Sequence, residues 1–154
     1  MAIEIERKYL VDGTDWRRPE AGSEFRQGYL STVKERTVRV RVIGERGYIA
    51  VKGITVGAVR TEFEYEIPAA DARTMLSDLC EQPIVEKIRY VIEWDGMTWE
   101  VDEFLGVNAG LVVAEVELED PNRQITLPPW IGEEVTDDPR YFNSNLVGHP
   151  YKDW

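Results

Sequence analysis

The stretch EIERK, near the start of the chain, places Glu4, Glu6 and Lys8 at alternate positions, with Ile5 between the carboxylates. Successive side chains of a β-strand point to opposite faces, so the three charges would share one face. Carboxylate oxygens bind hard divalent cations, and a lysine ammonium binds anions. This face therefore suits either contact with solvent or a site that holds a metal ion beside an anion.

Charged residues alternate with apolar ones in most other strand-like stretches, and the charges are sorted by sign. Basic pairs occur at Arg39 and Arg41 in TVRVRV and at Lys87 and Arg89 in EKIRYVI. The other charged positions in this alternation are Lys52, Arg60, Glu62, Glu64, Glu66, Glu100, Asp102, Glu115, Glu117 and Glu119. A solvated outer face of a sheet would explain the alternation, but like charges side by side repel there. Sorting by sign favours a charged interior.

Eight strands are predicted to position these residues, near 2–10, 24–31, 36–43, 47–53, 59–67, 84–93, 97–104 and 111–119. Turns are expected at Gly44 to Gly47 and at Asp95-Gly96, a strong two-residue hairpin signal. Short strands joined by small turns indicate a mainly β fold of the α+β class, either an antiparallel closed barrel or a sandwich. After residue 120 the pattern predicts irregular chain with one or two short helical turns, folded over an opening or an outer face.

One amphipathic helix is predicted over 69–82, with Ala72, Met75, Leu76 and Leu79 at helical spacing. Such a helix needs an apolar surface to cover, which a barrel with apolar strand faces turned outward provides. The charged faces would then line a central channel. Burying charges of one sign costs several kcal/mol per ion unless they are paired or coordinate something. Mg²⁺ or Mn²⁺ on the carboxylates, and a polyphosphate-like anion on the basic residues, would satisfy both groups.

Composition narrows the class of protein. At 154 residues, the chain is expected to form one domain over residues 1–154. Its 18 basic and 29 acidic residues give a net charge of −11, which argues against nucleic-acid binding. No apolar run approaches the roughly 20 residues of a membrane span. The single Cys80 cannot form an intramolecular disulfide, which favours a cytoplasmic protein, and the lone His149 excludes a histidine-based catalytic centre.

The chain resembles the CYTH superfamily, also called triphosphate tunnel metalloenzymes, and is most similar to its small bacterial tripolyphosphatases. The resemblance rests on EIERK near the N-terminus, on the QGYL stretch at 27–30, and on the basic and acidic pairs that follow in order. It implies an eight-stranded antiparallel closed barrel, the triphosphate tunnel, with a charged interior and helices packed outside. It also implies divalent-metal-dependent hydrolysis of inorganic tripolyphosphate to pyrophosphate and phosphate.

The resemblance also implies roles for individual residues. The metal ligands would be Glu4, Glu6, Glu115 and Glu117. The groups that bind the phosphates would be Lys8, Arg39, Arg41, Lys52, Arg60, Lys87 and Arg89. Glu62 would orient a basic side chain, Glu100 or Asp102 would add a metal contact, and Glu64, Glu66 and Glu119 would lie near the mouth of the tunnel.

Three residues are candidates for catalysis. Tyr29 is the candidate general base by resemblance, and the neighbouring cations are expected to lower its pKa. Lys8 or Lys87, with a depressed pKa, is the alternative. In each case the base would activate the water that attacks a terminal phosphoryl group.

Other functions use the same kind of channel. The enzymatic alternatives are a class IV-type adenylate cyclase and a nucleoside or thiamine triphosphatase. A non-enzymatic alternative is a module that binds an organic phosphate or polyphosphate, and a further one is a carrier with an apolar interior. The expected partner is a small triphosphate, without nucleic acid or membrane, and the chain is expected to be a monomer or a homodimer.

Overall fold

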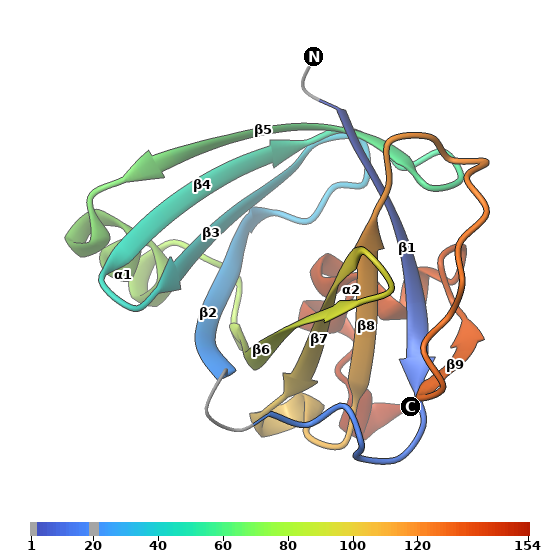
Figure 1. Ribbon diagram of the computed structural model, residues 1–154. Helices are drawn as coiled ribbons and strands as arrows, with labels where there is room; N and C mark the ends of the chain where they lie inside the picture. The colour runs from blue at the N-terminus through green and yellow to red at the C-terminus, as the bar shows by residue number, and fades with distance from the viewer. Residues whose placement is uncertain (1–2, 19–21) are drawn as a thin grey trace.

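A closed antiparallel barrel forms the body of the structure, a computed structural model that describes residues 3–18 and 22–154 (Figure 1). Within these residues the sheet has nine strands: β1 Ile3–Val11, β2 Gly22–Ser31, β3 Thr37–Ile43, β4 Arg46–Lys52, β5 Val59–Ile67, β6 Val85–Trp94, β7 Met97–Phe104, β8 Val112–Glu117 and β9 Ile131–Glu134. Their order is β5-β4-β3-β2-β6-β7-β8-β1-β9, and β5 also pairs with β1. This last pairing closes β1 to β8 into the predicted eight-stranded barrel.

The helical elements are few and short. They are α1 Ala69–Asp78, α2 Asn143–Gly148 and the 3₁₀ turns η2 Gly106–Asn108, η3 Pro139–Tyr141 and η4 Tyr151–Asp153. No helix of the described residues is long and apolar enough to cross a membrane. The predicted helix is confirmed but ends at Asp78, four residues early, and Leu79 is 65% exposed rather than packed.

The predicted strands are confirmed to within a few residues at their ends, as are both hairpins. The prediction for the chain after residue 120 is wrong in one respect, because residues Ile131–Glu134 form β9, which pairs with the end of β1. The pattern IGEE is too short to show alternation, so only its neighbour on β1 marks it as a strand.

The outward faces of the strands carry much of the apolar core, as the inside-out barrel requires. On one side of the barrel, α1 packs its Ala72 and Leu76 against Val40 and Val42 of β3, with Cys80 in the same cluster. On another side, Trp99 of β7 is fully buried among the side chains of β1, β6 and β8 and of Trp130. Both faces stay apolar because chain from outside the eight strands covers them.

One end of the barrel is filled by apolar side chains and covered by the C-terminal segment. The inward positions at this end include Tyr29, Val85, Phe104 and Val113, which continue the same alternation as the charged residues. They pack against residues of the C-terminal segment, namely Val135, Tyr141, Leu146 and Val147. The helix α2 therefore lies over an opening of the barrel, one of the two positions expected for this segment.

Candidate active site

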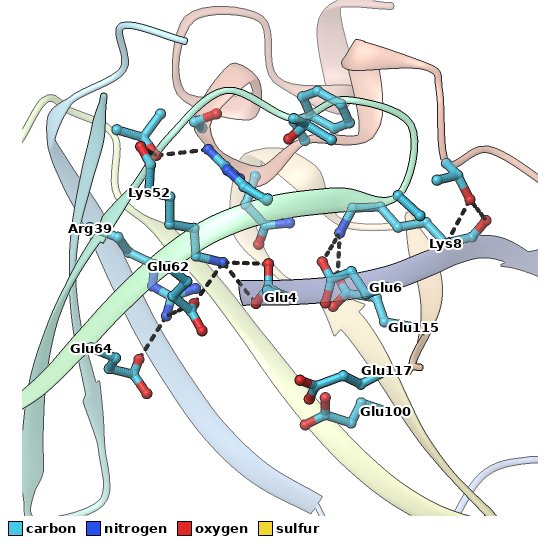
Figure 2. A pocket seen from close by; sticks show the side chains of 18 of the residues that line it. Glu4, Glu6, Lys8, Arg39, Lys52, Glu62, Glu64, Glu100, Glu115 and Glu117 are labelled. Atoms are coloured by element: carbon cyan, nitrogen blue, oxygen red, sulfur yellow. Dashed lines mark hydrogen bonds and ion pairs between the residues drawn. The ribbon is translucent and has the colours of Figure 1, made fainter. Parts of the chain in front are cut away.

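A cavity of about 270 Å³ lies inside the barrel, and charged side chains dominate its lining (Figure 2). All twelve predicted site residues line it: Glu4, Glu6, Lys8, Tyr29, Arg39, Arg41, Lys52, Arg60, Lys87, Arg89, Glu115 and Glu117. With Glu62, Glu64 and Glu100, the lining holds seven cationic side chains and seven carboxylates. The barrel thus brings together side chains from all eight strands, β1 to β8, with a single named residue each from β2, β4 and β7.

The register of β1 against β8 places Lys8 directly opposite Glu115. The Lys8 ammonium donates to Glu115 Oε1 at 2.7 Å and to Glu6 Oε1 at 3.1 Å. Burial alone would lower the pKa of Lys8, but the two carboxylates outweigh burial and raise it. The expected depression of the Lys8 pKa is therefore wrong, and Lys8 is a permanent cation.

Lys87 has the opposite electrostatic balance. Its ammonium lies 2.7 Å from Asp102 Oδ2, and Arg89 binds the same carboxylate through Nε at 2.7 Å. Burial is the largest influence and Arg89 adds to it, so the pKa of Lys87 falls to about 8 although Asp102 opposes the change. The expected depression is confirmed for Lys87.

Asp102 is 1% exposed, and both of its oxygens are bound by cations. It therefore orients Lys87 and Arg89. Of the two acidic residues predicted on β7, Glu100 keeps an oxygen free, because only its Oε2 contacts Arg89. Figure 2 shows Glu100 beside Glu117.

The two arginines of β3 share a single carboxylate. Arg39 Nη2 and Arg41 Nη2 lie 2.8 Å and 3.2 Å from Glu64 Oε2. Glu64 is exposed, as expected near the mouth, but it binds both arginines instead of being merely solvated. The Nε atoms of Arg39 and Arg41 are buried and have no hydrogen-bond partner among the described residues. Burial and Arg39 lower the pKa of Arg41 to about 10, so a bound anion would relieve an unbalanced positive charge.

Lys52 and Arg60 lie where β4 and β5 meet β1. The Lys52 ammonium is 3.2 Å from Glu4 and 3.0 Å from Glu62, so Glu62 orients a basic side chain as expected. Arg60 donates from Nε to the carbonyl of Gly53 and from Nη2 to Thr37 Oγ1, each at 2.8 Å. Arg60 thereby fastens the loop after β4 to the start of β3.

Tyr29 lies on β2 at the covered end of the barrel and is 5% exposed. Burial raises the pKa of its phenol, although Arg39, Arg60 and Lys8 act in the opposite direction. The expectation that neighbouring cations lower this pKa is wrong, because burial outweighs them.

Three comparisons with known proteins place the chain in a family. The family model described as "CYTH domain" matches residues 2–145. The chain belongs to the CYTH domain family. A protein of Acetivibrio thermocellus named "Inorganic triphosphatase" is 52% identical over 154 residues, covering all of this chain and 99% of that protein. A protein of Nitrosomonas europaea with the same name is 38% identical over 152 residues, covering 94% of this chain and 96% of that protein.

Solved structures agree with this assignment. A crystal structure described as an inorganic triphosphatase superposes with a TM-score of 0.65 at 34% identity, covering 94% of this chain and 97% of that chain. A putative adenylate cyclase of Bacillus halodurans gives a TM-score of 0.61 at 14% identity, covering 79% of this chain and 84% of that one. The second likeness shows the fold alone. The interior of the CYTH barrel is therefore the candidate active site.

The carboxylates of the CYTH barrel fit a hard divalent cation by their chemistry. Burial and then Glu115 raise the pKa of Glu6 to about 7, and burial followed by Glu4 and Glu100 raises that of Glu117. Lys8 and Lys52 oppose the rise at Glu6, and Lys52 opposes it at Glu117, but burial and the neighbouring carboxylates outweigh these cations. Among residues 3–18 and 22–154, no three His, Cys, Asp or Glu side chains form a ready metal site.

Several polar residues that line or support the cavity were not predicted. Thr37, Thr55, Thr136, Asn143 and Ser144 line it, and the buried Gln27 lies behind it. Gln27 could have been found, because it shares the inward alternation of β2 with Tyr29. Asn143 and Ser144 carry no such signal, since they come from a short helix whose position depends on tertiary packing.

Proposed function

We propose that this CYTH protein hydrolyses inorganic tripolyphosphate to pyrophosphate and phosphate with the help of Mg²⁺ or Mn²⁺. The observation that carries the proposal is the cavity itself, whose lining includes seven cationic side chains. A compact polyanion matches this lining. The names of the two relatives, at 52% and 38% identity over nearly the whole chain, favour the inorganic substrate over a nucleotide.

The basic residues would bind and orient the phosphates. Arg39 and Arg41 line the cavity from β3, Lys8 and Lys52 add point charges, and Arg89 is held in place by Asp102. Planar guanidinium groups match phosphate oxygens, so these side chains would stabilise the charge that spreads over the transferred group. Arg60 would contribute less, because two of its donors are already committed.

The predicted metal ligands line the same cavity from two neighbouring strands, Glu4 and Glu6 from β1 and Glu115 and Glu117 from β8. A divalent cation bound there would polarise phosphoryl oxygens and offset substrate charge. Glu100 adds a free oxygen beside Glu117.

Lys87 is the best general base of the three catalytic candidates. Its pKa of about 8 leaves a substantial neutral fraction near neutral pH, whereas Lys8 and Tyr29 both hold their protons more tightly than usual. Lys87 would accept a proton from the attacking water, and Lys8 and Tyr29 would donate to the phosphates.

Phosphate release from tripolyphosphate, ATP and pyrophosphate, with Mg²⁺, with Mn²⁺ or with EDTA, tests the proposal. Metal-dependent cleavage of tripolyphosphate is expected, and Glu6→Ala and Arg41→Ala should abolish it. Matched controls are Glu66→Ala and Arg46→Ala, which alter exposed side chains outside the cavity lining. Conversion of ATP to pyrophosphate would indicate a cyclase, and binding without turnover would indicate a phosphate-binding module. If the protein neither binds nor cleaves tripolyphosphate, the proposal is refuted.

The proposal also includes the extent of the domain, the cellular location and the assembly of the protein. The family match from 2 to 145 supports a single CYTH unit over residues 1–154. The lone, buried Cys80 is compatible with the expected cytoplasmic location. A monomer or a homodimer stays the prediction for its assembly.

A further inference from the structure

The C-terminal helix α2 brings a side chain into the cavity that belongs to no strand of the barrel. Asn143, the first residue of α2, lines the cavity beside Lys87. Its Oδ1 accepts hydrogen bonds from Lys87 Nζ at 2.9 Å and from Gln27 Nε2 at 2.8 Å. Both donors lie on the barrel wall, on β6 and β2, so the two bonds join α2 to the interior of the barrel.

These contacts fix which way the Asn143 amide faces. A lysine ammonium has three donors and no acceptor, so the atom that faces Lys87 must be the oxygen. The amide nitrogen then points elsewhere. Asn143 Nδ2 makes no hydrogen bond to any residue that the structure describes, yet it is not among the buried polar atoms without a partner. Asn143 lines the same cavity as the cationic side chains, and its Nδ2 keeps two N–H groups that no described residue accepts.

We propose that Asn143 is a substrate-contacting residue, whose Nδ2 donates to a phosphoryl oxygen at the covered end of the barrel. This inference rests on the proposed function, because it names a further contact for the same polyphosphate. The covered end of the barrel, under α2, is filled by apolar side chains. Asn143 would therefore contact the terminal phosphoryl group of the polyphosphate that lies nearest to this end. It would distinguish a phosphoryl terminus from a group that has no acceptor oxygen there.

The substitution Asn143→Asp separates substrate contact from mere support of Lys87. Aspartate keeps an oxygen for Lys87 and Gln27 but turns a second oxygen, instead of a donor, toward the polyanion. Asn143→Ala removes both functions without adding charge. The matched control is Asn145→Asp, which makes the same change on the exposed side of α2, where Asn145 binds only the carbonyl of Pro139.

The measurement is KM and kcat for tripolyphosphate with Mg²⁺, together with the melting temperature of each variant. Asn143→Asp is expected to raise KM by about 10- to 100-fold, the range for a hydrogen bond to a charged group. Asn143→Ala should raise it less, and Asn145→Asp should leave it unchanged. All variants should melt as cooperative, folded proteins.

Two results would overturn the inference. One is an unchanged KM in Asn143→Asp, which would mean that Asn143 only supports Lys87. The other is a loss confined to kcat, which would mean that the new carboxylate acts through Lys87. If the unsubstituted protein does not cleave tripolyphosphate, the proposed function itself fails, and this failure is seen before any variant is compared.

Discussion

At the scale of single residues, most cations in the cavity have a carboxylate partner within 3.3 Å. Lys8 is paired with Glu115, Lys52 with Glu62, and Arg39 with Glu64. Pairing keeps these groups ionised in a low-dielectric interior, where a lone charge would be costly. Burial still lowers the pKa of two cations: that of Lys87, where burial and Arg89 outweigh Asp102, and that of Arg41.

The first prediction concerns the pH dependence of the activity. The pKa of Lys87 is lowered from its ordinary value of 10.5 to about 8, so the neutral amine forms as the pH rises through 8. Asp102 opposes this loss of the proton, while Arg89 favours it, and Glu115 opposes it more weakly. If Lys87 is the base, kcat should rise with pH from about 7 to 9 and then level off.

Lys87→Arg provides the test. Arginine keeps the charge and the donors but does not titrate in this range, so the variant should lose at least 100-fold in kcat and should lose the rising limb. The profile is measured from pH 6.5 to 9.5 at saturating tripolyphosphate and Mg²⁺. A rising limb that persists in the variant would assign the base to another group.

The second prediction concerns the stability contributed by Asp102. Its carboxylate is buried and binds both Lys87 and Arg89, and these cations hold its pKa below the usual value. Asp102→Ala removes the carboxylate that binds Lys87 and leaves Arg89 with Glu100 as its carboxylate partner. Removing one partner of a buried ion pair typically costs about 3–5 kcal/mol. Urea unfolding should show this loss, whereas Glu24→Ala on the exposed face of β2 should change the free energy of unfolding by less than about 0.5 kcal/mol. A similar small loss in both variants would contradict the assigned role.

At the scale of secondary structure, the alternation within each strand decides both the fold and the site. The same parity that turns Arg39 and Arg41 inward turns Val40 and Val42 outward against α1. Side chains alternate between the two faces of a strand. The pairing register that turns the charged residues toward the cavity therefore also turns the apolar residues outward. This coupling explains why the residues that line the cavity could be predicted along with the strands, whereas their roles stay predictions.

Elements without a strong pattern could not be placed in this way. The four residues of β9 lie in a stretch whose periodicity is too short to identify a strand, and α2 has only six residues. The positions of both depend on packing against the end of the barrel, which no local pattern encodes. Asn143 was missed for this reason, and the pKa directions of Lys8 and Tyr29 were wrong because burial and pairing depend on the whole site.

The third prediction concerns the contact between α1 and β4. A Cβ atom at Gly47 would lie 2.7 Å from the Cβ of Ala72 and 3.2 Å from the Cα of Ala69, so the helix lies directly on this glycine. Gly47→Ala should displace α1 and cost roughly 1–3 kcal/mol, the usual penalty for overpacking. Because α1 covers the outside of the barrel, KM for tripolyphosphate should stay within twofold.

Gly44→Ala is not a suitable control, since Gly44 has a positive φ of 58° and a side chain there is strained whatever the space. Gly53→Ala is better matched, because its nearest neighbour would be an ordinary 3.6 Å contact with Thr61. Unfolding of both variants in urea compares them directly. Equal stability of the two would show that α1 adjusts freely over β4.

At the scale of the whole molecule, the acidic excess lies outside the cavity. The chain carries a net charge of −11, whereas the lining holds equal numbers of cationic and carboxylate side chains. A polyanion therefore approaches a negative surface before it reaches the cations. A divalent cation on the substrate or on the carboxylates would reduce this repulsion, so the proposed metal would contribute to association as well as to chemistry.

The fourth prediction concerns the stability that Glu6, one of the proposed metal ligands, takes from the folded protein. The raised pKa of Glu6 means that its ionised form is disfavoured in the folded protein, chiefly by burial and by Glu115. The contribution of Glu6 to the free energy of unfolding is fully present below pH 4.5, where its carboxyl is protonated. This contribution is lost as the pH rises from 4.5 through 7, the raised pKa of the folded protein. Glutamine resembles the protonated form and keeps an oxygen for Lys8. At pH 8 without metal, Glu6→Gln should therefore melt a few °C higher than the unsubstituted protein, since 1 kcal/mol corresponds to about 2–4 °C at this size.

Adding Mg²⁺ should reverse the order of the two proteins. A ligand that binds only the folded state stabilises it, by about 2.7 kcal/mol at 100 times Kd. The unsubstituted protein should gain in melting temperature as Mg²⁺ is titrated, and the gain should saturate. Glu6→Gln should gain much less, because a ligand oxygen has lost its charge, whereas Glu66→Gln on the exposed rim should gain as much as the unsubstituted protein. An equal rise in melting temperature for Glu6→Gln on adding Mg²⁺ would mean that Glu6 does not bind the cation.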